Sequence, residues 1–440
     1  MDKRVKFSSK GTPEMINQAT LFELGKNVTK PNRKQQNLPY KRIRDEYWDF
    51  KTTPASIGIY GIHPYPAMLH FLVVRELLQG YSKEGDTILD PFMGSGVVAG
   101  ECLINNRNFI GYDINPLAVL IAKVRTTPIP TPQLLNFLNL IEENYYKNLP
   151  EAVEFHNIHY WFEEDIIKQL SKLRKSIFCL EEEDTRDFFN VAFSETVRKV
   201  SKTKYNEFKL LRRKSNNANS DAMKVFKEIS LSNIGLLTEF YRTYKHKKMQ
   251  IVLENKNIFE ASGLEDSSID LVITSPPYGD SKTTVAYGQF SRLSLRWLGL
   301  EENVDKTSLG SKPKDIIFNL PSKVLYEVLH KIVDKDEKRA KEVFSFYDEL
   351  FRAIQIMTQK VKKNGYVCFV VGNRRVKSEE LPTDKISADF FETQGFQHIK
   401  TIVRAISNKR MPIENAPSNI KGKKDFTMRY EYIVILKKQI

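Results

Sequence analysis

Cysteine is scarce in this chain, and its scarcity excludes two ways of stabilising a protein. The 440 residues include three cysteines, Cys102, Cys179 and Cys368. Their odd number leaves one without a disulfide partner, and none has the spacing to a second ligand that structural metal sites show. We therefore expect no disulfide framework and no metal site, as in a protein of the reducing cytoplasm.

Long apolar runs are absent too. Nowhere do about 18 apolar residues follow one another, the length that a membrane-spanning helix needs. The first residues, 1–6, lack the apolar stretch of a signal peptide. No internal repeat and no low-complexity tract occurs. We expect a soluble intracellular protein without a membrane partner.

Basic residues, by contrast, are in excess. The chain has 68 Lys and Arg against 54 Asp and Glu, a net charge of +14 and a pI near 9.3. Such a balance favours polyanionic partners such as nucleic acid. The excess is local: residues 191–250 carry fourteen Lys and Arg against five Asp and Glu, whereas residues 151–190 carry ten acids against five bases.

Aromatic and hydroxyl side chains are interleaved with the bases of residues 191–250. This mixture is typical of surfaces that contact phosphates, although a solvated helix face gives a similar charge run. The candidate nucleic-acid contacts in this stretch are Arg198, Lys199, Lys202, Lys204, Lys209, Arg212 and Arg213.

Short apolar runs alternate with helix-like segments along the chain. Helices are expected at residues 67–78, closed by Gly80, and at residues 97–103. Strands are expected at residues 87–90, 108–113, 250–253, 269–273, 366–371, 401–406 and 430–436. The alternation predicts an α/β protein with a seven-stranded, mostly parallel sheet covered by helices, and the last two strands resemble an antiparallel pair.

One step of this alternation is far too long. A strand–helix–strand unit takes on the order of 30 residues, yet the second and third strands lie much further apart than that. The sequence therefore predicts a basic N-terminal arm that packs loosely at residues 1–55, a main domain formed by residues 56–126 and 250–440, and a helical region, 127–249, inserted into it.

The first motif with chemical content is the sequence DPFMGSG at residues 90–96. It lies where the first strand turns into a helix, and its two glycines let a ligand approach the backbone and the free N–H groups of the helix. A mere tight turn would also explain a Gly-x-Gly. However, Asp113 ends the second strand about 20 residues later, placed to accept hydrogen bonds from two ribose hydroxyls. The pair predicts a site for a nucleoside cofactor.

The second motif is Thr274-Ser275-Pro276-Pro277-Tyr278, directly after an apolar strand. Two consecutive prolines stiffen the loop and withhold two N–H donors, so its carbonyls are free to accept hydrogen bonds from an amine. The aromatic side chain that follows can stack on a flat ring. The motif indicates a site that holds a planar heterocycle by its exocyclic amino group.

Together the two motifs resemble those of the amino-methyltransferases that modify DNA bases in restriction–modification systems. That resemblance implies a Rossmann-like class I methyltransferase fold, S-adenosylmethionine as cofactor, double-stranded DNA as substrate and a cognate restriction endonuclease as partner, in a prokaryotic cytoplasm at the nucleoid. The family carries either Asp or Ser before Pro-Pro-Tyr. Serine, as in this chain, is more typical of the enzymes that methylate cytosine at N4.

The resemblance also implies roles for individual residues. His63-Pro64-Tyr65-Pro66 resembles a motif that lines the methionine end of the cofactor, although alone it could be a turn. Asn257 stands where the family often has an acidic residue. Residues 365–374 and 410–412 resemble later parts of the catalytic domain. The expected cofactor contacts are His63, Tyr65, Asp90, Pro91, Phe92, Gly94, Ser95, Gly96, Asp113 and Asn257.

The expected reaction takes place at residues 275–278. Ser275 and the Pro276 carbonyl would accept the two amine hydrogens, Pro277 would stiffen the loop, and Tyr278 would stack on a base flipped out of the duplex. No residue is identified that takes the released proton. Methylation of cytosine at carbon 5 needs a cysteine in this loop, which is absent.

In the family, this motif order places target recognition in the middle of the chain, where the basic excess lies. A second candidate DNA contact is the loop 281–340, with Lys282 and Arg292, which could instead be a lid over the cofactor. Three alternatives stay open at this stage: an adenine-N6 DNA methyltransferase, an RNA guanine methyltransferase, whose usual RNA-binding domain is not recognisable here, and a non-catalytic DNA-binding specificity subunit.

Overall fold

The structure is a computed structural model. It describes residues 36–38, 41–205, 207–213, 221–243, 249–261, 263–279, 287–317, 319–406, 414–415, 425–426 and 428–439. The predicted contact Lys282 and the motif at 410–412 lie outside these residues.

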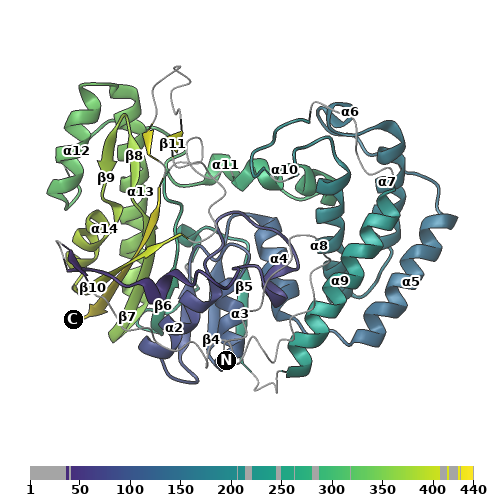
Figure 1. The fold of residues 1–440 in the computed structure, drawn as a ribbon, viewed down its shortest axis with the longest axis horizontal. Helices are drawn as coiled ribbons and strands as arrows, with labels where there is room; N and C mark the ends of the chain where they lie inside the picture. Colours follow the sequence, from purple (N-terminus) through teal and green to yellow (C-terminus); the bar gives the residue numbers. More distant parts are fainter. Residues whose placement is uncertain are drawn as a thin grey trace, which may run out of the picture.

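A single large sheet forms the centre of the molecule (Figure 1). In the described part of the chain it has nine strands, in the order β1 (Gln36–Leu38), β2 (Arg42–Arg44), β10 (Phe396–Ala405), β13 (Tyr430–Lys438), β7 (Val361–Gly372), β6 (Ile269–Thr274), β3 (Thr87–Asp90), β4 (Asn108–Tyr112) and β5 (Ile251–Glu254). From β7 to β5 all strands are parallel, whereas β13 is antiparallel to both of its neighbours. The seven predicted strands and their antiparallel C-terminal pair are confirmed, and the fold is of the Rossmann-like class I type.

The two remaining strands belong to the predicted N-terminal arm. β2 runs parallel to β10 at the sheet edge, and the 3-10 helix η1 (Glu46–Asp49) follows it with Tyr47 and Trp48 buried. Arg42 forms two 2.7 Å hydrogen bonds to the carboxylate of buried Asp384. The expectation of a loosely packed arm is therefore wrong for residues 41–50, because ion pairing to buried carboxylates folds this basic segment onto the sheet.

Helices cover both faces of the sheet, because alternate strand residues point to opposite sides. Ile88 packs with α2 (Phe71–Tyr81), α3 (Val97–Ile104) and α4 (Pro116–Thr126). Its neighbour Leu89 packs with α12 (Lys323–Val333), α13 (Glu337–Lys360) and α14 (Thr383–Glu392). The predicted helix 67–78 begins later than expected, where the His70 side chain accepts the Leu72 N–H, and it continues through Gly80.

The insertion is helical, as predicted, and it forms a lobe beside the sheet (Figure 1). The described helices of the inserted region are α5 (Thr131–Lys147), α6 (Ile158–Trp161), α7 (Glu164–Phe178), α8 (Glu183–Val200) and α9 (Ala222–Thr243). A further helix, α10 (Tyr287–Leu298), follows the second motif in sequence yet packs against α8. We call α5 to α10 the helical lobe.

Trp297 shows how closely α10 belongs to this lobe. Its side chain is fully buried, and its ring packs edge to face on Phe155, Phe162 and Phe193. The lobe and the adjoining face of the sheet share one hydrophobic core. The helical lobe is thus packed directly against the sheet.

The described residues also include smaller elements. These are the 3-10 helices η2 (Gly58–Gly61) and η3 (Ile258–Glu260), the helix α11 (Val304–Thr307), and the strand pairs β8 (Arg374–Val376) with β9 (Glu379–Leu381) and β11 (Glu414–Asn415) with β12 (Asp425–Phe426). Within the described ranges, no helix is both long enough and apolar enough to cross a bilayer.

Candidate functional site

A cleft of about 960 Å³, open solvent at its mouth included, lies at the carboxyl ends of β3, β4 and β6. Ligands of parallel α/β sheets bind at this edge, because the loops that leave the strands meet there. The predicted site residues that line the cleft are Tyr65, Asp90, Pro91, Phe92, Gly94, Ser95, Asp113, Asn257, Ser275 and Pro277. The structure thus brings both sequence motifs to one cavity.

The conformation of residues 90–96, which we call the glycine loop, depends on two glycines. Gly94 and Gly96 have φ values of 51° and 77°, in the left-handed region that favours glycine. The Asp113 carboxylate accepts hydrogen bonds from the backbone N–H of Gly94, at 2.9 Å, and of Asn115, at 2.8 Å. Gly96 does not line the cleft. Its Cα faces Ala122 of α4, so its role is close packing.

The two motifs are directly bonded. The Thr274 hydroxyl donates a 2.6 Å hydrogen bond to the Asp90 carboxylate, which also accepts the Phe92 N–H. Asp90 is almost fully buried, and burial raises its pKa to about 7. This contact fixes the position of residues 274–278, which we call the catalytic loop after their expected role, relative to the glycine loop.

The cleft offers a hydrogen-bond acceptor and a largely apolar lining that suit a nucleoside cofactor. Asp113 is hydrogen-bonded at two backbone N–H groups, and a carboxylate has lone pairs left for further hydroxyl donors. A Cβ at Gly94 would lie 3.5 Å from the Tyr65 ring and would narrow the cavity between them. Most of the remaining lining is apolar, as in many small-molecule sites.

Cofactor affinity is expected to depend on pH through Asp113. Burial raises the pKa of this carboxyl to about 6, so in the free protein it is ionised above that pH and protonated below it. If the ionised form accepts hydroxyl hydrogens of S-adenosylmethionine, affinity should fall from about pH 8 to about pH 5, approaching tenfold per unit below the pKa. Calorimetric titration measures this, and Asp113→Asn should bind weakly at every pH. If the affinity of Asp113→Asn fell with pH as steeply as that of the wild type, the titrating group would be Asp90 and not Asp113.

In the catalytic loop, Ser275 and Pro277 face the cleft, whereas Pro276 is buried and Tyr278 is half-buried behind them. The Ser275 hydroxyl donates to the Tyr278 hydroxyl at 3.2 Å. Tyr278 in turn donates to Glu431 of β13 at 3.1 Å. Pro276 and Tyr278 are therefore not themselves cleft-lining residues in this structure.

Several residues at the cleft are not among the predicted cofactor contacts. Asn115 begins α4 and donates to the Tyr65 hydroxyl, at 3.0 Å, and to Ser291, at 2.8 Å. The sequence Asn115-Pro116 is a helix-start signal and would have predicted the α4 terminus. Tyr287, residues 304 and 305, and residues 307–309 also line the cleft. All of them lie within residues 281–340, for which the sequence left a lid over the cofactor as the alternative to a DNA contact.

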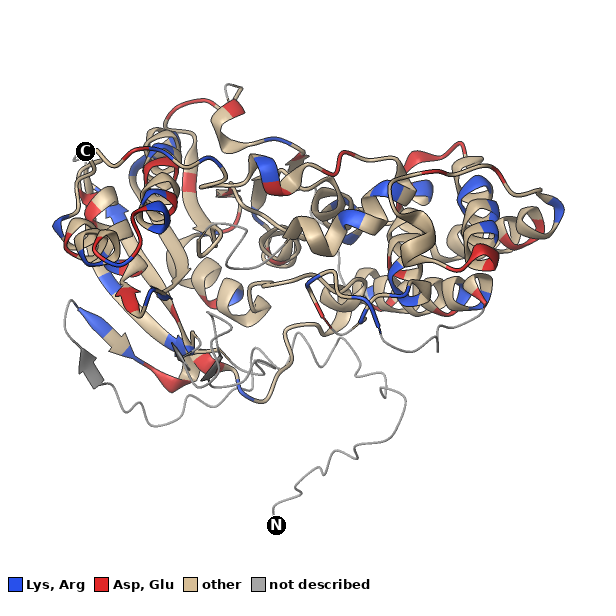
Figure 2. Cartoon of the chain, turned by 90° about the horizontal axis from the view of Figure 1, so that it is seen from above, with Lys and Arg blue, Asp and Glu red and all other residues tan. Residues whose placement is uncertain are grey.

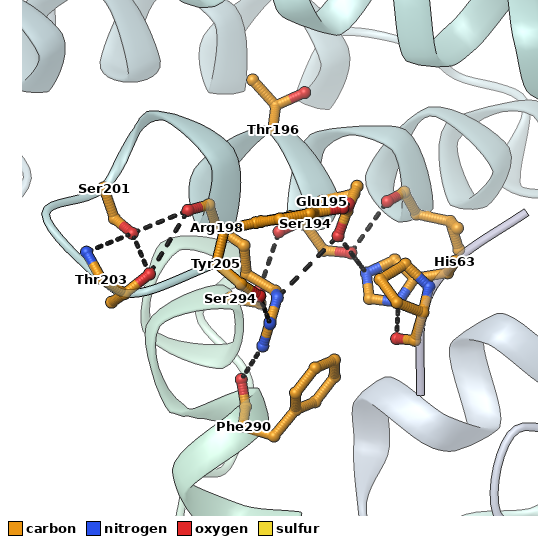
Figure 3. A network of polar contacts seen from close by, with 12 residues as sticks. His63, Ser194, Glu195, Thr196, Arg198, Ser201, Thr203, Tyr205, Phe290 and Ser294 are labelled. Atoms are coloured by element: carbon orange, nitrogen blue, oxygen red, sulfur yellow. Dashed lines mark hydrogen bonds and ion pairs between the residues drawn. The ribbon is translucent and has the colours of Figure 1, made fainter. Parts of the chain in front are cut away.

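His63 does not line the cleft. Its ring is fully buried, with Nδ1 2.7 Å from the Pro64 carbonyl and Nε2 2.8 Å from the Ser194 hydroxyl on α8 (Figure 3). Burial lowers its pKa to about 3, so the ring is neutral. Both His63 and Tyr65 were predicted to contact the cofactor, but only Tyr65 lines the cleft, because the His63 side chain is turned toward the helical lobe.

Arg198 is likewise an internal residue. Its guanidinium donates to the Phe290 carbonyl at 3.1 Å and lies 3.6 Å from the centre of the Phe290 ring (Figure 3). The residue is 8% exposed. It joins α8 to α10, and it cannot reach a DNA backbone without breaking these contacts.

The other predicted DNA contacts differ in exposure. Lys204, Lys209 and Arg212 are exposed, whereas Lys199 and Arg213 are half-buried. Lys202 pairs with Glu163 at 3.0 Å, and Arg292 lies 3.4 Å from Asp305. In Figure 2, basic and acidic segments alternate over the helical lobe, so its described surface is not uniformly positive.

Alanine substitutions of two arginines should therefore affect different properties, stability in one case and DNA binding in the other. Arg198→Ala is expected to lower the free energy of unfolding by about 3 kcal/mol, because it removes a buried charge-assisted hydrogen bond and a stacking contact. Arg212→Ala, on an exposed side chain whose contact with the Tyr160 ring contributes at most about 1 kcal/mol, should have a much smaller effect on stability and should weaken DNA binding with a smaller salt slope. Urea unfolding and DNA binding at several salt concentrations measure both. An unchanged stability of Arg198→Ala would contradict its structural role.

The chain is similar to known DNA methyltransferases along most of its length. A family model for N6/N4 methyltransferases, described as DNA methylase, matches residues 6–124 and 269–439. Type II methyltransferase M.MvaI of Kocuria varians is 37% identical over 438 residues, covering 91% of this chain and 96% of that protein. Type II methyltransferase M.BsoBI of Geobacillus stearothermophilus is 22% identical over 402 residues, covering 74% of this chain and 76% of that protein. A solved S-adenosylmethionine-dependent methyltransferase from Methanosarcina mazei superposes with a TM-score of 0.31 at 11% identity, over 86% of this chain and 99% of that one.

Proposed function

This chain belongs to the N6/N4 family of S-adenosylmethionine-dependent DNA methylases of restriction–modification systems, and we propose that it methylates the exocyclic N4 amine of cytosine in a specific double-stranded sequence. The methyl mark would protect that sequence from a cognate restriction endonuclease. The observation that carries the choice of cytosine is Ser275, a neutral hydroxyl in the cleft at the position where an aspartate is more typical of adenine enzymes.

The proposed reaction depends on the hydrogen bonds that the catalytic loop makes to the amine. Bound S-adenosylmethionine supplies a methyl group activated by a sulfonium. The lone pair of the amine is delocalised into the ring, so Ser275 and the Pro276 carbonyl would each accept one amine hydrogen and direct the lone pair toward the methyl group. Because the Ser275 hydroxyl hydrogen is already donated to Tyr278, its oxygen is left as an acceptor.

The half-buried Tyr278 ring is proposed to stack on the flipped base. Its hydroxyl is held by Ser275 and Glu431, and one ring edge lies beside Gly372, where a Cβ would come within 2.8 Å of the ring carbon Cδ2. A ring held in this way has its orientation fixed before the base arrives, which lowers the entropy cost of stacking.

DNA is proposed to bind over the helical lobe. Exposed Lys204, Lys209 and Arg212 supply charge there, and Arg212 lies over the exposed Tyr160 ring at 4.5 Å. The family model does not match residues 125–268, whereas M.MvaI matches along most of the chain. A region that varies within a family is where a sequence-specific contact would be expected.

The test is to digest DNA from cells that express the chain to nucleosides and identify the methylated one by mass spectrometry. N4-methylcytosine within one sequence context supports the proposal. N6-methyladenine would replace it with the adenine alternative. A chain that binds S-adenosylmethionine but methylates neither base would favour the non-catalytic specificity subunit.

A further inference from the structure

Glu431, near the start of β13, lies behind the catalytic loop and outside the cleft. One carboxylate oxygen, Oε1, accepts the hydrogen of the Tyr278 hydroxyl at 3.1 Å, and that hydroxyl accepts from Ser275 at 3.2 Å. Three residues therefore form a continuous chain of hydrogen bonds, which begins at the cleft with Ser275 and ends at a carboxylate.

The carboxylate is fixed at its other oxygen. Glu431 Oε2 is paired with Arg404 of β10, whose Nε donates to the Trp48 carbonyl at 2.7 Å. The Arg404 side chain is 5% exposed and that of Glu431 is 14% exposed, so the pair is shielded but Glu431 retains some contact with solvent. The N-terminal segment that folds onto the sheet thereby holds Glu431 in place.

On the basis of the proposed function, we propose that Ser275, Tyr278 and Glu431 form a relay that carries the proton of the methylated amine to Glu431. Methyl transfer leaves an extra proton on the amine nitrogen. That proton passes to Ser275 Oγ, the Ser275 hydroxyl proton passes to Tyr278, and the Tyr278 hydroxyl proton passes to Glu431 Oε1. One N–H and two O–H bonds break and three O–H bonds form. The amine becomes neutral, and so does the carboxylate.

Three features favour this route. The alkylated amine is a far stronger acid than a carboxylic acid, because its neutral form regains delocalisation into the ring. Burial and the nearby Glu431 carboxylate raise the pKa of Tyr278 well above its usual value, so its hydroxyl stays neutral and can accept one proton while it donates another. The partial exposure of Glu431 allows the proton to leave for water afterwards.

Asp90 is the other carboxylate hydrogen-bonded to the catalytic loop in the described structure. It is bonded to Thr274 and not to Ser275, so it is not placed to receive the proton from the amine. Its partner is the Thr274 hydroxyl, and neither it nor Thr274 has a hydrogen bond to Ser275 among the described contacts. Glu431 is thus the carboxylate to which the Ser275 hydroxyl is connected.

Single-turnover methylation with saturating S-adenosylmethionine tests the relay. Glu431→Gln keeps the shape of the side chain and removes its basicity, and Tyr278→Phe keeps the ring and removes the hydroxyl. Each should lower the rate by about 10²- to 10⁴-fold, the usual contribution of general acid–base catalysis.

The double variant should be no slower than the slower single variant, because both changes interrupt the same relay. Affinity for S-adenosylmethionine and for DNA should stay at the wild-type level, and exposed Glu327→Gln should have no effect.

Chemical rescue separates proton transfer from mere positioning of Tyr278. Glu431→Ala leaves a space beside Arg404 that a small anion can enter. Formate, which can take a proton, should restore much of the rate, whereas nitrate, of similar shape and charge but without basicity, should not. Equal rescue by nitrate, or a Glu431→Gln rate within about threefold of wild type, would overturn the relay. The wild-type nucleoside product, measured in the same reactions, tests the proposed function separately, since these rate ratios do not depend on which base is methylated.

Discussion

Replacement of Tyr278 by alanine is expected to lower the single-turnover rate of methyl transfer by at least about 10³-fold, with little change in S-adenosylmethionine affinity. The ring is proposed to hold the flipped base, and misplacement of a reacting group costs about 10²-fold by itself. The hydroxyl adds the proton relay, which contributes a further factor of about 10² or more. Tyr278 does not line the cofactor cleft, so cofactor binding should be preserved.

Asp113→Ala should have the opposite pattern to Tyr278→Ala, with a large effect on cofactor affinity. It removes the carboxylate that fixes Gly94 and Asn115 and faces the cleft, so cofactor affinity should fall sharply. Calorimetry with S-adenosylmethionine and single-turnover assays, made on both variants, should show a crossed pattern. Tyr278→Phe should lie between wild type and Tyr278→Ala, because it retains the ring. Full methyl transfer by Tyr278→Ala would refute the stacking role.

The sheet was predictable because each of its main strands carries its own local signal. The run at residues 269–273 has apolar residues on both faces, as a strand covered by helices on both sides needs, and so has the pair Ile88 and Leu89 at residues 87–90. β2 has no such signal. It is a short basic segment, and its place in the sheet depends on partners far away in the sequence: β10, along which it runs, and Asp384, which pairs with Arg42.

The cleft was largely predictable for a related reason. Asp90 ends a strand, Asp113 and Ser275 each follow one directly, and the carboxyl ends of parallel strands meet at one edge. Glu431 was not predictable, since it lies 153 residues from its partner Tyr278 and looks like any polar residue at a strand end. Proximity of this kind arises from strand order and leaves no trace in local sequence.

Charge was the least reliable guide. Arg42, Arg198 and Arg404 are all basic residues that a composition count assigns to a polyanion, yet each is bonded to an internal carboxylate or carbonyl. Arginine suits such positions, because its guanidinium can satisfy several acceptors at once and retain its charge when buried. In this chain, part of the basic excess stabilises the fold, and exposed lysines such as Lys204 and Lys209 are the stronger candidates for DNA contact.

Gly96→Ala is expected to lower the free energy of unfolding by about 3 kcal/mol and to impair cofactor binding. Gly96 has a φ of 77°, a conformation that costs a residue with a Cβ about 1–2 kcal/mol. The new Cβ would also lie 2.5 Å from the Ala122 Cβ and 3.0 Å from the Ala122 Cα. Neither atom belongs to a flexible side chain, so α4 or the glycine loop must move, at a cost of about 1–3 kcal/mol.

Gly235→Ala provides the control for Gly96→Ala, because Gly235 lies in α9 with open space where its Cβ would be. There alanine should raise stability by about 0.5–1 kcal/mol, since it has the higher helix propensity. Urea unfolding of both variants, with and without S-adenosylmethionine, measures the contrast. Any displacement of the glycine loop also displaces the N–H of Gly94 from Asp113, so the stabilisation by cofactor should shrink in Gly96→Ala alone. Wild-type stability and affinity in Gly96→Ala would show that the contact with α4 can relax without disturbing the loop.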